Sequence, residues 1–307
     1  MGSETKAMDM RDWGLLVFLS VLWGATFFWA GVAVRELPPL TVVLIRVALA
    51  ALILLPLLFW AGHRLPRSVS GWVPFLGMGL LNNVLPFGFI FAGQTQIGVG
   101  LSAIINSMTP LFTVLVMAGF REERLTRLRL IGVLLGVAGV GVLNGGGAAL
   151  QQGQILGIAL CMAGAMSYGF AALWARRRLA GVPPIKSATC QLICSTAILL
   201  PVVTLIDRPW TLAMPSVGVL YSLAALAVLG TALAYLVFFR IVASAGPSNV
   251  MLVTLLIPLT AILLGWALLN EAVTARDLIG AGVIGLGLLF IDGRIPSRLR
   301  RARHARL

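Results

Sequence analysis

PLTVVLIRVALAALILLPLLFW, residues 39–60, is an apolar run in which Arg46 is the single charged side chain. A helix rises 1.5 Å per residue and needs about 20 residues to cross a hydrocarbon layer about 30 Å thick. The run is continuously apolar and does not alternate with period two, which is the pattern of a barrel strand. It therefore indicates a membrane-spanning helix.

Nine further runs of this kind lie elsewhere in the sequence. In the whole chain, 59% of the residues are hydrophobic and 11% are charged. A soluble globular domain carries about 25% charged residues, so the composition excludes a soluble fold. We expect an all-α polytopic membrane protein with ten transmembrane helices. The predicted helices are approximately Asp12–Val34, Pro39–Trp60, Gly71–Ala92, Gly98–Gly119, Leu128–Leu143, Gly153–Ala175, Pro184–Ile206, Pro215–Phe239, Gly246–Leu269 and Asp277–Ile291.

The positive charges gather on one side of the predicted membrane. All but four of the 23 Lys and Arg residues fall in segments that share a side with the N-terminus; the four are Arg46, within a helix, and Arg35, Arg208 and Arg276, on the other side. This asymmetry is typical of a protein whose N- and C-termini are both cytoplasmic. The net charge of +13 therefore indicates contact with the lipid bilayer, above all by the basic cytoplasmic tail 293–307, and not binding to nucleic acid.

The second half of the chain repeats the first. The tetrapeptide at 53–56, Ile-Leu-Leu-Pro, recurs at 198–201, and Glu123 and Thr126 are matched by Glu271 and Thr274. Two five-helix repeats, 12–145 and 153–292, follow from this match. Because five is odd, the two repeats must be inverted in the membrane, an arrangement that places ligand sites near the midplane between the repeats. Alternating access of that site to the two sides is the expected mechanism.

These motifs resemble the EamA family of the drug/metabolite transporter superfamily. The resemblance covers nearly the whole chain and rests on a set of residues from both halves: Trp23-Gly24-x-x-Phe27, Arg46, Pro110, Glu123-Arg124-Leu125-Thr126, Leu130-Ile131-Gly132, and in the second half Pro258, Glu271, Thr274 and Leu278-Ile279-Gly280. It implies a central cavity surrounded by helices 1 to 4 and 6 to 9, with helices 5 and 10 packed at one side. The chain is also similar to YddG-type exporters of amino acids.

Helices 5 and 10 carry small residues at close spacing, such as Gly132 and Gly139 in one and Gly280 and Gly287 in the other. Small residues at such spacing allow two helix backbones to approach closely, so we expect these helices to pack on each other.

Arg46 is a candidate binding residue, because charged side chains within transmembrane segments are costly and are often functional. It could hold a substrate carboxylate. Alternatively, it could bond to helix-end carbonyls or reach the membrane interface as an anchor. The residue at its repeat position is Gln191.

A mixed polar and aromatic stripe supplies further candidates. Asn83, Phe87 and Phe91 recur at intervals of four residues and thus share one helix face. Ligand sites are mostly apolar with a few polar groups, so the stripe fits a cavity for amphipathic solutes, although its polar groups could equally bond between helices. The remaining candidates for the lining are Trp23, Asn106, Tyr168 and Tyr235.

No chemistry beyond transport is indicated. The sequence lacks a Gly-Lys-Ser/Thr phosphate loop and any catalytic or metal-binding cluster, so we expect neither an enzyme nor a cofactor nor a metal. All ten acidic residues lie in loops or at helix ends, which favours transport without an intramembrane carboxylate relay. The predicted function is export of small amphipathic metabolites, foremost aromatic or apolar amino acids, across the inner membrane by a monomer or homodimer. The alternatives are a proton-coupled carrier of drugs or other metabolites, and a membrane protein without a transport role.

Overall fold

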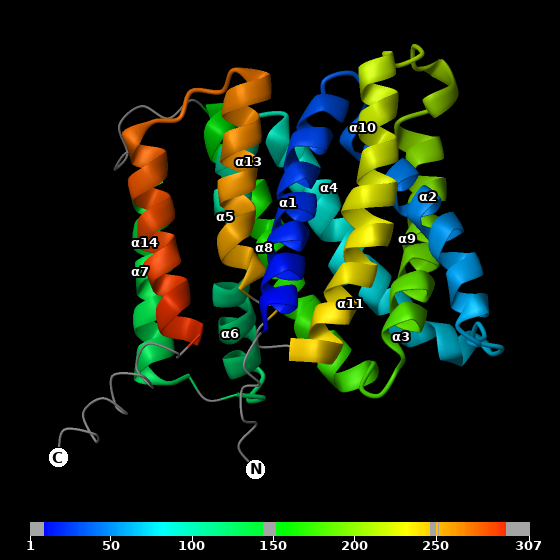
Figure 1. The fold of residues 1–307 in the computed structure, drawn as a ribbon. Helices are drawn as coiled ribbons and strands as arrows, with labels where there is room; N and C mark the ends of the chain where they lie inside the picture. Colours follow the sequence, from blue (N-terminus) through cyan, green and yellow to red (C-terminus); the bar gives the residue numbers. More distant parts are fainter. Residues whose placement is uncertain (1–8, 124, 144–151, 246–249, 251, 293–307) are drawn as a thin grey trace.

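The structure is a computed structural model that describes residues 9–123, 125–143, 152–245, 250 and 252–292 (Figure 1). These residues form a bundle of helices without strands. The first half contains α1 (Met10–Ala33), α2 (Pro39–Trp60), α3 (Val69–Gly79), the π-helical turn η1 (Leu80–Val84), α4 (Leu85–Gln94), α5 (Val99–Asn106), α6 (Thr109–Gly119) and α7 (Arg127–Leu143). The second half contains α8 (Gln152–Arg178), α9 (Pro184–Ile206), the short 3₁₀ turn η3 (Pro209–Thr211), α10 (Val217–Ala227), the π-helical turn η4 (Val228–Leu233), α11 (Ala234–Ala245), α13 (Val253–Leu269) and α14 (Ala275–Asp292).

Seven helical segments of the described chain are long and apolar enough to cross a membrane, and α13 is a shorter apolar helix. Of the ten predicted spans, two more correspond to α7 and α14. Their first turns carry charged residues, Arg127 and Arg129 in α7 and Arg276 and Asp277 in α14. The chain is thus an all-helical polytopic membrane protein, and the count of ten spans stays a prediction.

Proline fixes several helix boundaries. Pro39 and Pro184 stand in the first turns of α2 and α9, where a missing N–H costs nothing, and both helices have the predicted bounds. The span predicted over 98–119 is present as Val99–Gly119, but its helix is interrupted between Asn106 and Thr109, just before Pro110. A proline cannot donate the backbone bond that would continue α5, so a new helix begins there.

Two other boundaries differ from the prediction. The helix expected to end at Phe239 continues to Ala245, and α13 begins at Val253. Residues 246–249, where the sequence predicts the start of that helix, lie outside the described residues, as does the tail 293–307.

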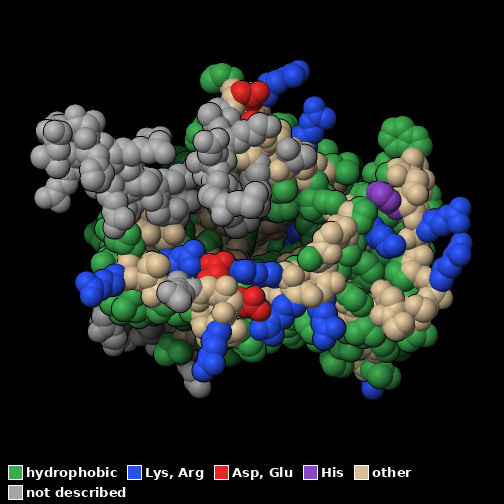
Figure 2. All heavy atoms as spheres, turned by 90° about the horizontal axis from the view of Figure 1, so that it is seen from below, with side chains coloured by type: hydrophobic (Ala, Val, Ile, Leu, Met, Phe, Trp, Pro, Cys, Tyr) green, Lys and Arg blue, Asp and Glu red, His purple; other side chains and the backbone are tan. Residues whose placement is uncertain are grey.

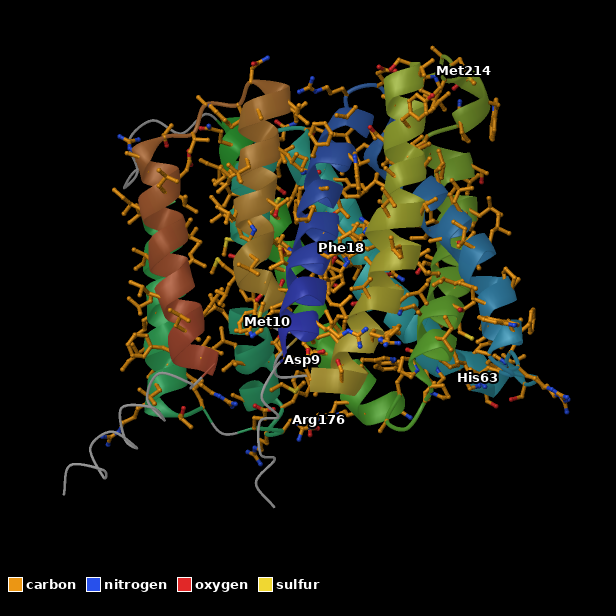
Figure 3. The ribbon with its side chains drawn as sticks, viewed as in Figure 1. Asp9, Met10, Phe18, His63, Arg176 and Met214 are labelled. Atoms are coloured by element: carbon orange, nitrogen blue, oxygen red, sulfur yellow. The ribbon has the colours of Figure 1, made fainter. Side chains whose placement is uncertain are left out.

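Corresponding helices of the two halves run in opposite directions. The start of α1 at Met10 and the last turn of α8 at Arg176 lie at the same end of the bundle, with His63, whereas Met214 lies at the opposite end (Figure 3). We call the first the basic end, because Lys and Arg side chains are prominent on the face seen from below (Figure 2). The basic end is the side that the charge distribution predicts to be cytoplasmic.

The halves pack against each other along several helix pairs, among them α2 with α9, α1 with α13, α4 with α8, and α7 with α14. In the last pair, a Cβ added to Gly132 would lie 2.6 Å from the carbonyl oxygen of Gly287, and one added to Gly139 would lie 3.0 Å from that of Gly280. The backbones touch where the side chains are absent, which confirms the predicted packing of these helices. Figure 1 shows the α7–α14 pair at one side of the bundle.

Candidate functional site

A cavity of about 450 Å³ lies between the two halves. Its walls come from helices of both halves and combine aromatic, amide and hydroxyl side chains with one guanidinium. The lining residues are Trp23, Thr26, Phe27, Arg46, Met78, Asn82, Phe87, Ile90, Phe91, Asn106, Ser107, Thr109, Thr113, Tyr168, Ala172, Ser187, Gln191, Gly230, Tyr235, Phe238, Phe239, Thr254 and Ile257.

The cavity extends from the middle of the bundle toward the basic end. There it reaches Ser187, three residues after the first residue of α9, and Phe239, in the middle of α11. Toward the opposite end the lining stops at the level of Phe27 and Arg46. The cavity is therefore deeper on the basic side.

Glu271 joins the halves at the opposite end. Its Oε1 accepts a hydrogen bond from the backbone N–H of Val99 (2.7 Å) and its Oε2 accepts one from that of Gly100 (3.1 Å). These N–H groups belong to the first turn of α5, where a helix has unpaired donors and a partial positive charge. A carboxylate of the second half thus caps a helix of the first half.

Two further carboxylates make similar links at that end. Glu36 accepts hydrogen bonds from the hydroxyl (2.6 Å) and the backbone N–H (2.7 Å) of Ser216, the N-cap of α10. These bonds stabilise the charged form and hold the pKa of Glu36 below its ordinary value. Asp207 accepts a hydrogen bond from the Thr41 hydroxyl at 2.7 Å. At the opposite end, polar contacts thus join the two halves.

Arg46 lies in the cavity wall with 5% of its surface exposed. Its Nε donates to the Thr231 hydroxyl (2.9 Å) and its Nη2 donates to the Gly230 carbonyl (3.4 Å). The guanidinium carbon stands 3.9 Å from the centre of the Phe87 ring and 5.8 Å from that of Phe91, which are cation–π distances. The prediction of an interface anchor is wrong, because the side chain is buried; a bond to a helix carbonyl is present.

Aromatic rings from both halves complete the wall. Phe87 and Phe91 stack with centroids 6.1 Å apart, and Tyr235 and Phe239 are also 6.1 Å apart. Trp23 lies against Phe238 of the other half, with ring centroids at 5.5 Å. The rings provide flat apolar surfaces beside the guanidinium.

Asn83 is not brought to the cavity. It is fully buried, and its Nδ2 donates to Ser195 Oγ at 3.0 Å, so it bonds between helices, one of the two roles expected for this stripe. Its neighbour Asn82 lines the cavity and donates to Gln191 Oε1 at 3.0 Å. The π-helical turn Leu80–Val84 explains why Asn82 and not Asn83 faces the cavity. One residue inserted into a helix rotates the neighbouring side chains by about 100° around the helix axis.

The structure brings the other seven predicted residues to one lining: Trp23, Arg46, Phe87, Phe91, Asn106, Tyr168 and Tyr235. Among them Asn106 stands out, because its buried Oδ1 has no hydrogen-bond partner among the described residues. Sequence reasoning missed Asn82 and Phe238. The adjacent Asn82–Asn83 pair signalled an amide at this level of the helix, but not which of the two faces the cavity.

Known proteins resemble the chain over most of its length. The profile of the EamA-like transporter family matches residues 12–145 and 155–292. The uncharacterized inner membrane transporter YedA of Escherichia coli is 26% identical over 282 residues, 91% of this chain and 89% of YedA. The uncharacterized transporter YvbV of Bacillus subtilis is 27% identical, with 92% of each chain covered.

Protein PecM of Dickeya dadantii is 27% identical over 304 residues, 96% of this chain and 97% of its own. A crystal structure with 22% sequence identity has the same fold, with a TM-score of 0.65 over 92% of this chain and 96% of that one. The duplicated family match coincides with the two halves that enclose the cavity. The chain therefore belongs to the EamA-like transporter family, a family of multi-pass membrane transporters and not of enzymes.

Proposed function

We propose that this secondary transporter exports small amphipathic metabolites, foremost aromatic or apolar amino acids, across the inner membrane. The observation that carries the proposal is the cavity between the halves, in which one buried guanidinium stands beside stacked aromatic rings. An amphipathic carboxylate matches both features, since its charged end pairs with Arg46 and its apolar body lies against the rings.

Alternating access between two inverted five-helix repeats accounts for the shape of the cavity. We place the N- and C-termini in the cytoplasm, with ten helices spanning the membrane and the basic end facing inward. The described conformation then accepts solute from the cytoplasm. To release it, the halves separate where Glu271, Glu36 and Asp207 now hold them together, and close at the basic end.

Transport proceeds without a proton relay in this proposal. Among the described residues, the cavity lining contains no Asp, Glu or His. Proton-driven carriers place such groups on the solute path, so solute here moves down its own gradient. Uptake into proteoliposomes that requires an imposed pH gradient and collapses with a protonophore would contradict this step and favour the proton-coupled alternative.

The test of the site uses purified protein in liposomes, with radiolabelled phenylalanine as the tracer and other amino acids and quaternary ammonium drugs as competitors. We expect saturable flux that Trp23→Ala, Asn82→Ala and Tyr235→Ala each lower, since each side chain lines the cavity. Trp266→Ala is the matched control, because Trp266 is 62% exposed on the outer surface of the bundle.

All variants should keep the parent's membrane yield. Normal flux in all three cavity variants would overturn the site assignment. If the tracer shows no saturable flux and no competitor inhibits its entry, the proposed transport of amphipathic solutes is wrong. The cavity is enclosed by one chain, so the proposal holds for a monomer or a homodimer.

A further inference from the structure

Arg46 carries a positive charge for which the described residues supply no paired carboxylate. It is nearly fully buried, and no described carboxylate lies within 4 Å of its guanidinium nitrogens. The four ion pairs of the described residues lie elsewhere, among Arg129, Arg176 and Arg177 with Glu122 and Glu123. An unpaired charge is costly to bury, so an occupant of the cavity that brings a negative charge is strongly favoured.

The guanidinium is held so that part of its hydrogen-bonding capacity is free. Of its five N–H donors, one binds Thr231 and one makes a long contact with Gly230, and Phe87 covers one face of the plane. The Nη1 nitrogen makes no hydrogen bond to any described residue. A carboxylate can accept two parallel bonds from such an edge.

Apart from Arg46, the polar groups of the cavity suit a neutral hydrogen-bond donor on the solute and not a positively charged group. The described lining offers amides, hydroxyls and aromatic rings but no acidic side chain. Among the described lining residues, the one buried side-chain acceptor without a partner is Asn106 Oδ1, which is neutral. An ammonium group placed there would lose its water and find no carboxylate in the described lining, whereas a single neutral acceptor satisfies an amide N–H.

We infer that the transporter selects organic monoanions, with a carboxylate at Arg46 and an aromatic or apolar body, in preference to zwitterions of the same skeleton. The inference rests on the proposed function and narrows its substrate class to amphipathic carboxylates without a charged amino group, so that free amino acids become the weaker substrates. Each exported molecule then carries one net negative charge outward. A potential of 100 mV, negative inside, shifts the equilibrium distribution of such an anion about 50-fold toward the outside.

A matched series of three solutes tests the charge rule: N-acetylphenylalanine (monoanion), phenylalanine (zwitterion) and phenylalaninamide (monocation). Each competes against labelled N-acetylphenylalanine in proteoliposomes, with the potential set by potassium and valinomycin. We expect half-inhibition by N-acetylphenylalanine at a concentration at least about tenfold lower than by phenylalanine, weakest inhibition by phenylalaninamide, and efflux that accelerates with a negative interior.

Arg46→Gln should abolish the preference for the monoanion over the zwitterion, while Arg64→Gln, which removes an exposed arginine, should leave this preference unchanged. Arg46→Lys keeps the charge but not the paired donors, and should retain the charge preference with weaker binding. If Arg46→Gln fails to fold, the solute series on the parent protein decides the question alone.

Equal or better inhibition by phenylalanine, or flux of the monoanion that ignores the potential, would overturn the charge rule while leaving a transporter. Absence of saturable flux for all three solutes would overturn both the rule and the proposed function. A last experiment replaces gluconate by chloride in the assay buffer. If millimolar chloride inhibits N-acetylphenylalanine flux in the parent but not in Arg46→Gln, and phenylalanine flux stays unchanged, the site holds an inorganic anion. The inference then fails.

Discussion

Replacing Glu271 by glutamine changes one atom and one charge at the first turn of α5. In the parent protein the two carboxylate oxygens accept from the N–H groups of Val99 and Gly100 at 2.7 and 3.1 Å. The glutamine oxygen can accept one of these bonds. Its NH₂ group then faces the second backbone donor, and no bond forms there.

The free-energy cost follows from these two changes. A hydrogen bond to a charged group contributes about 1.5–3 kcal/mol, and a carboxylate at a helix N-terminus contributes about 0.3–1 kcal/mol beyond it. We therefore expect Glu271→Gln to weaken the link between the halves by about 2–4 kcal/mol. At about 1.4 kcal/mol per tenfold, the lower value shifts the population of the conformation open at this end by about 30-fold.

Labelling of a cysteine behind the closed end measures that shift. The three native cysteines, all buried, are first replaced, and Phe91→Cys then places a thiol on the cavity lining near the closed end. A membrane-impermeant maleimide is added from the side opposite the basic end of oriented vesicles. Labelling should be faster by an order of magnitude or more in Glu271→Gln than in the parent.

Asp277→Asn is the matched control. Its carboxylate lies in the same loop region but accepts from the N–H and hydroxyl of Thr274, three residues away in the same half. The control removes an equal charge without touching a link between halves. Equal labelling rates in Glu271→Gln and the parent, or an equal acceleration in Asp277→Asn, would refute the assignment of Glu271 as a link that closes this end.

Three other predictions concern stability. Gly24→Ala places a Cβ 2.5 Å from a threonine Cβ of α13 and should lower stability in detergent by about 1–3 kcal/mol, whereas Gly14→Ala, with nothing within 4 Å, should not; equal melting temperatures would contradict this. Because its pKa is lowered in the folded protein, Glu36 stabilises the fold above its ordinary pKa, and this stabilisation is lost as pH falls through the folded value. Ser216→Ala should therefore reduce the fall of the melting temperature between neutral and acid pH. Asn83→Ala should cost about 1 kcal/mol in unfolding experiments yet leave tracer affinity unchanged.

Local patterns predicted most of the bundle. The runs from Pro39 and Pro184 specify both a helix and its first residue, because apolar length and proline geometry are properties of neighbouring residues. Seven of eight predicted lining residues meet in one cavity because the repeat pairs positions across the halves, as with Trp23 and Tyr168. Their role in binding stays a prediction.

Contacts between distant segments could not be predicted in the same way. The sequence indicates that Glu123 and Glu271 stand at the starts of helices 5 and 10, since each precedes a threonine by three residues. Both glutamates do lie just before those helices, α7 and α14. In addition, Glu271 caps α5, 172 residues away along the chain, and Glu123 pairs with Arg129 (2.7 Å) and Arg176 (3.1 Å). Such choices depend on which helices pack together, which no local pattern contains.

The two π-helical turns make the bundle sensitive to chain length in a way that substitutions do not reveal. Within η4, Thr231 Oγ1 donates to the Leu226 carbonyl five residues earlier, and the Gly230 carbonyl is available to Arg46. Deleting one residue from this turn would restore ordinary helical spacing and swing Tyr235 about 100° around the helix axis. A helix shorter by a single residue would thus keep its span, its hydrophobicity and nearly its whole sequence, and lose both the aromatic wall and the acceptor that orients the guanidinium.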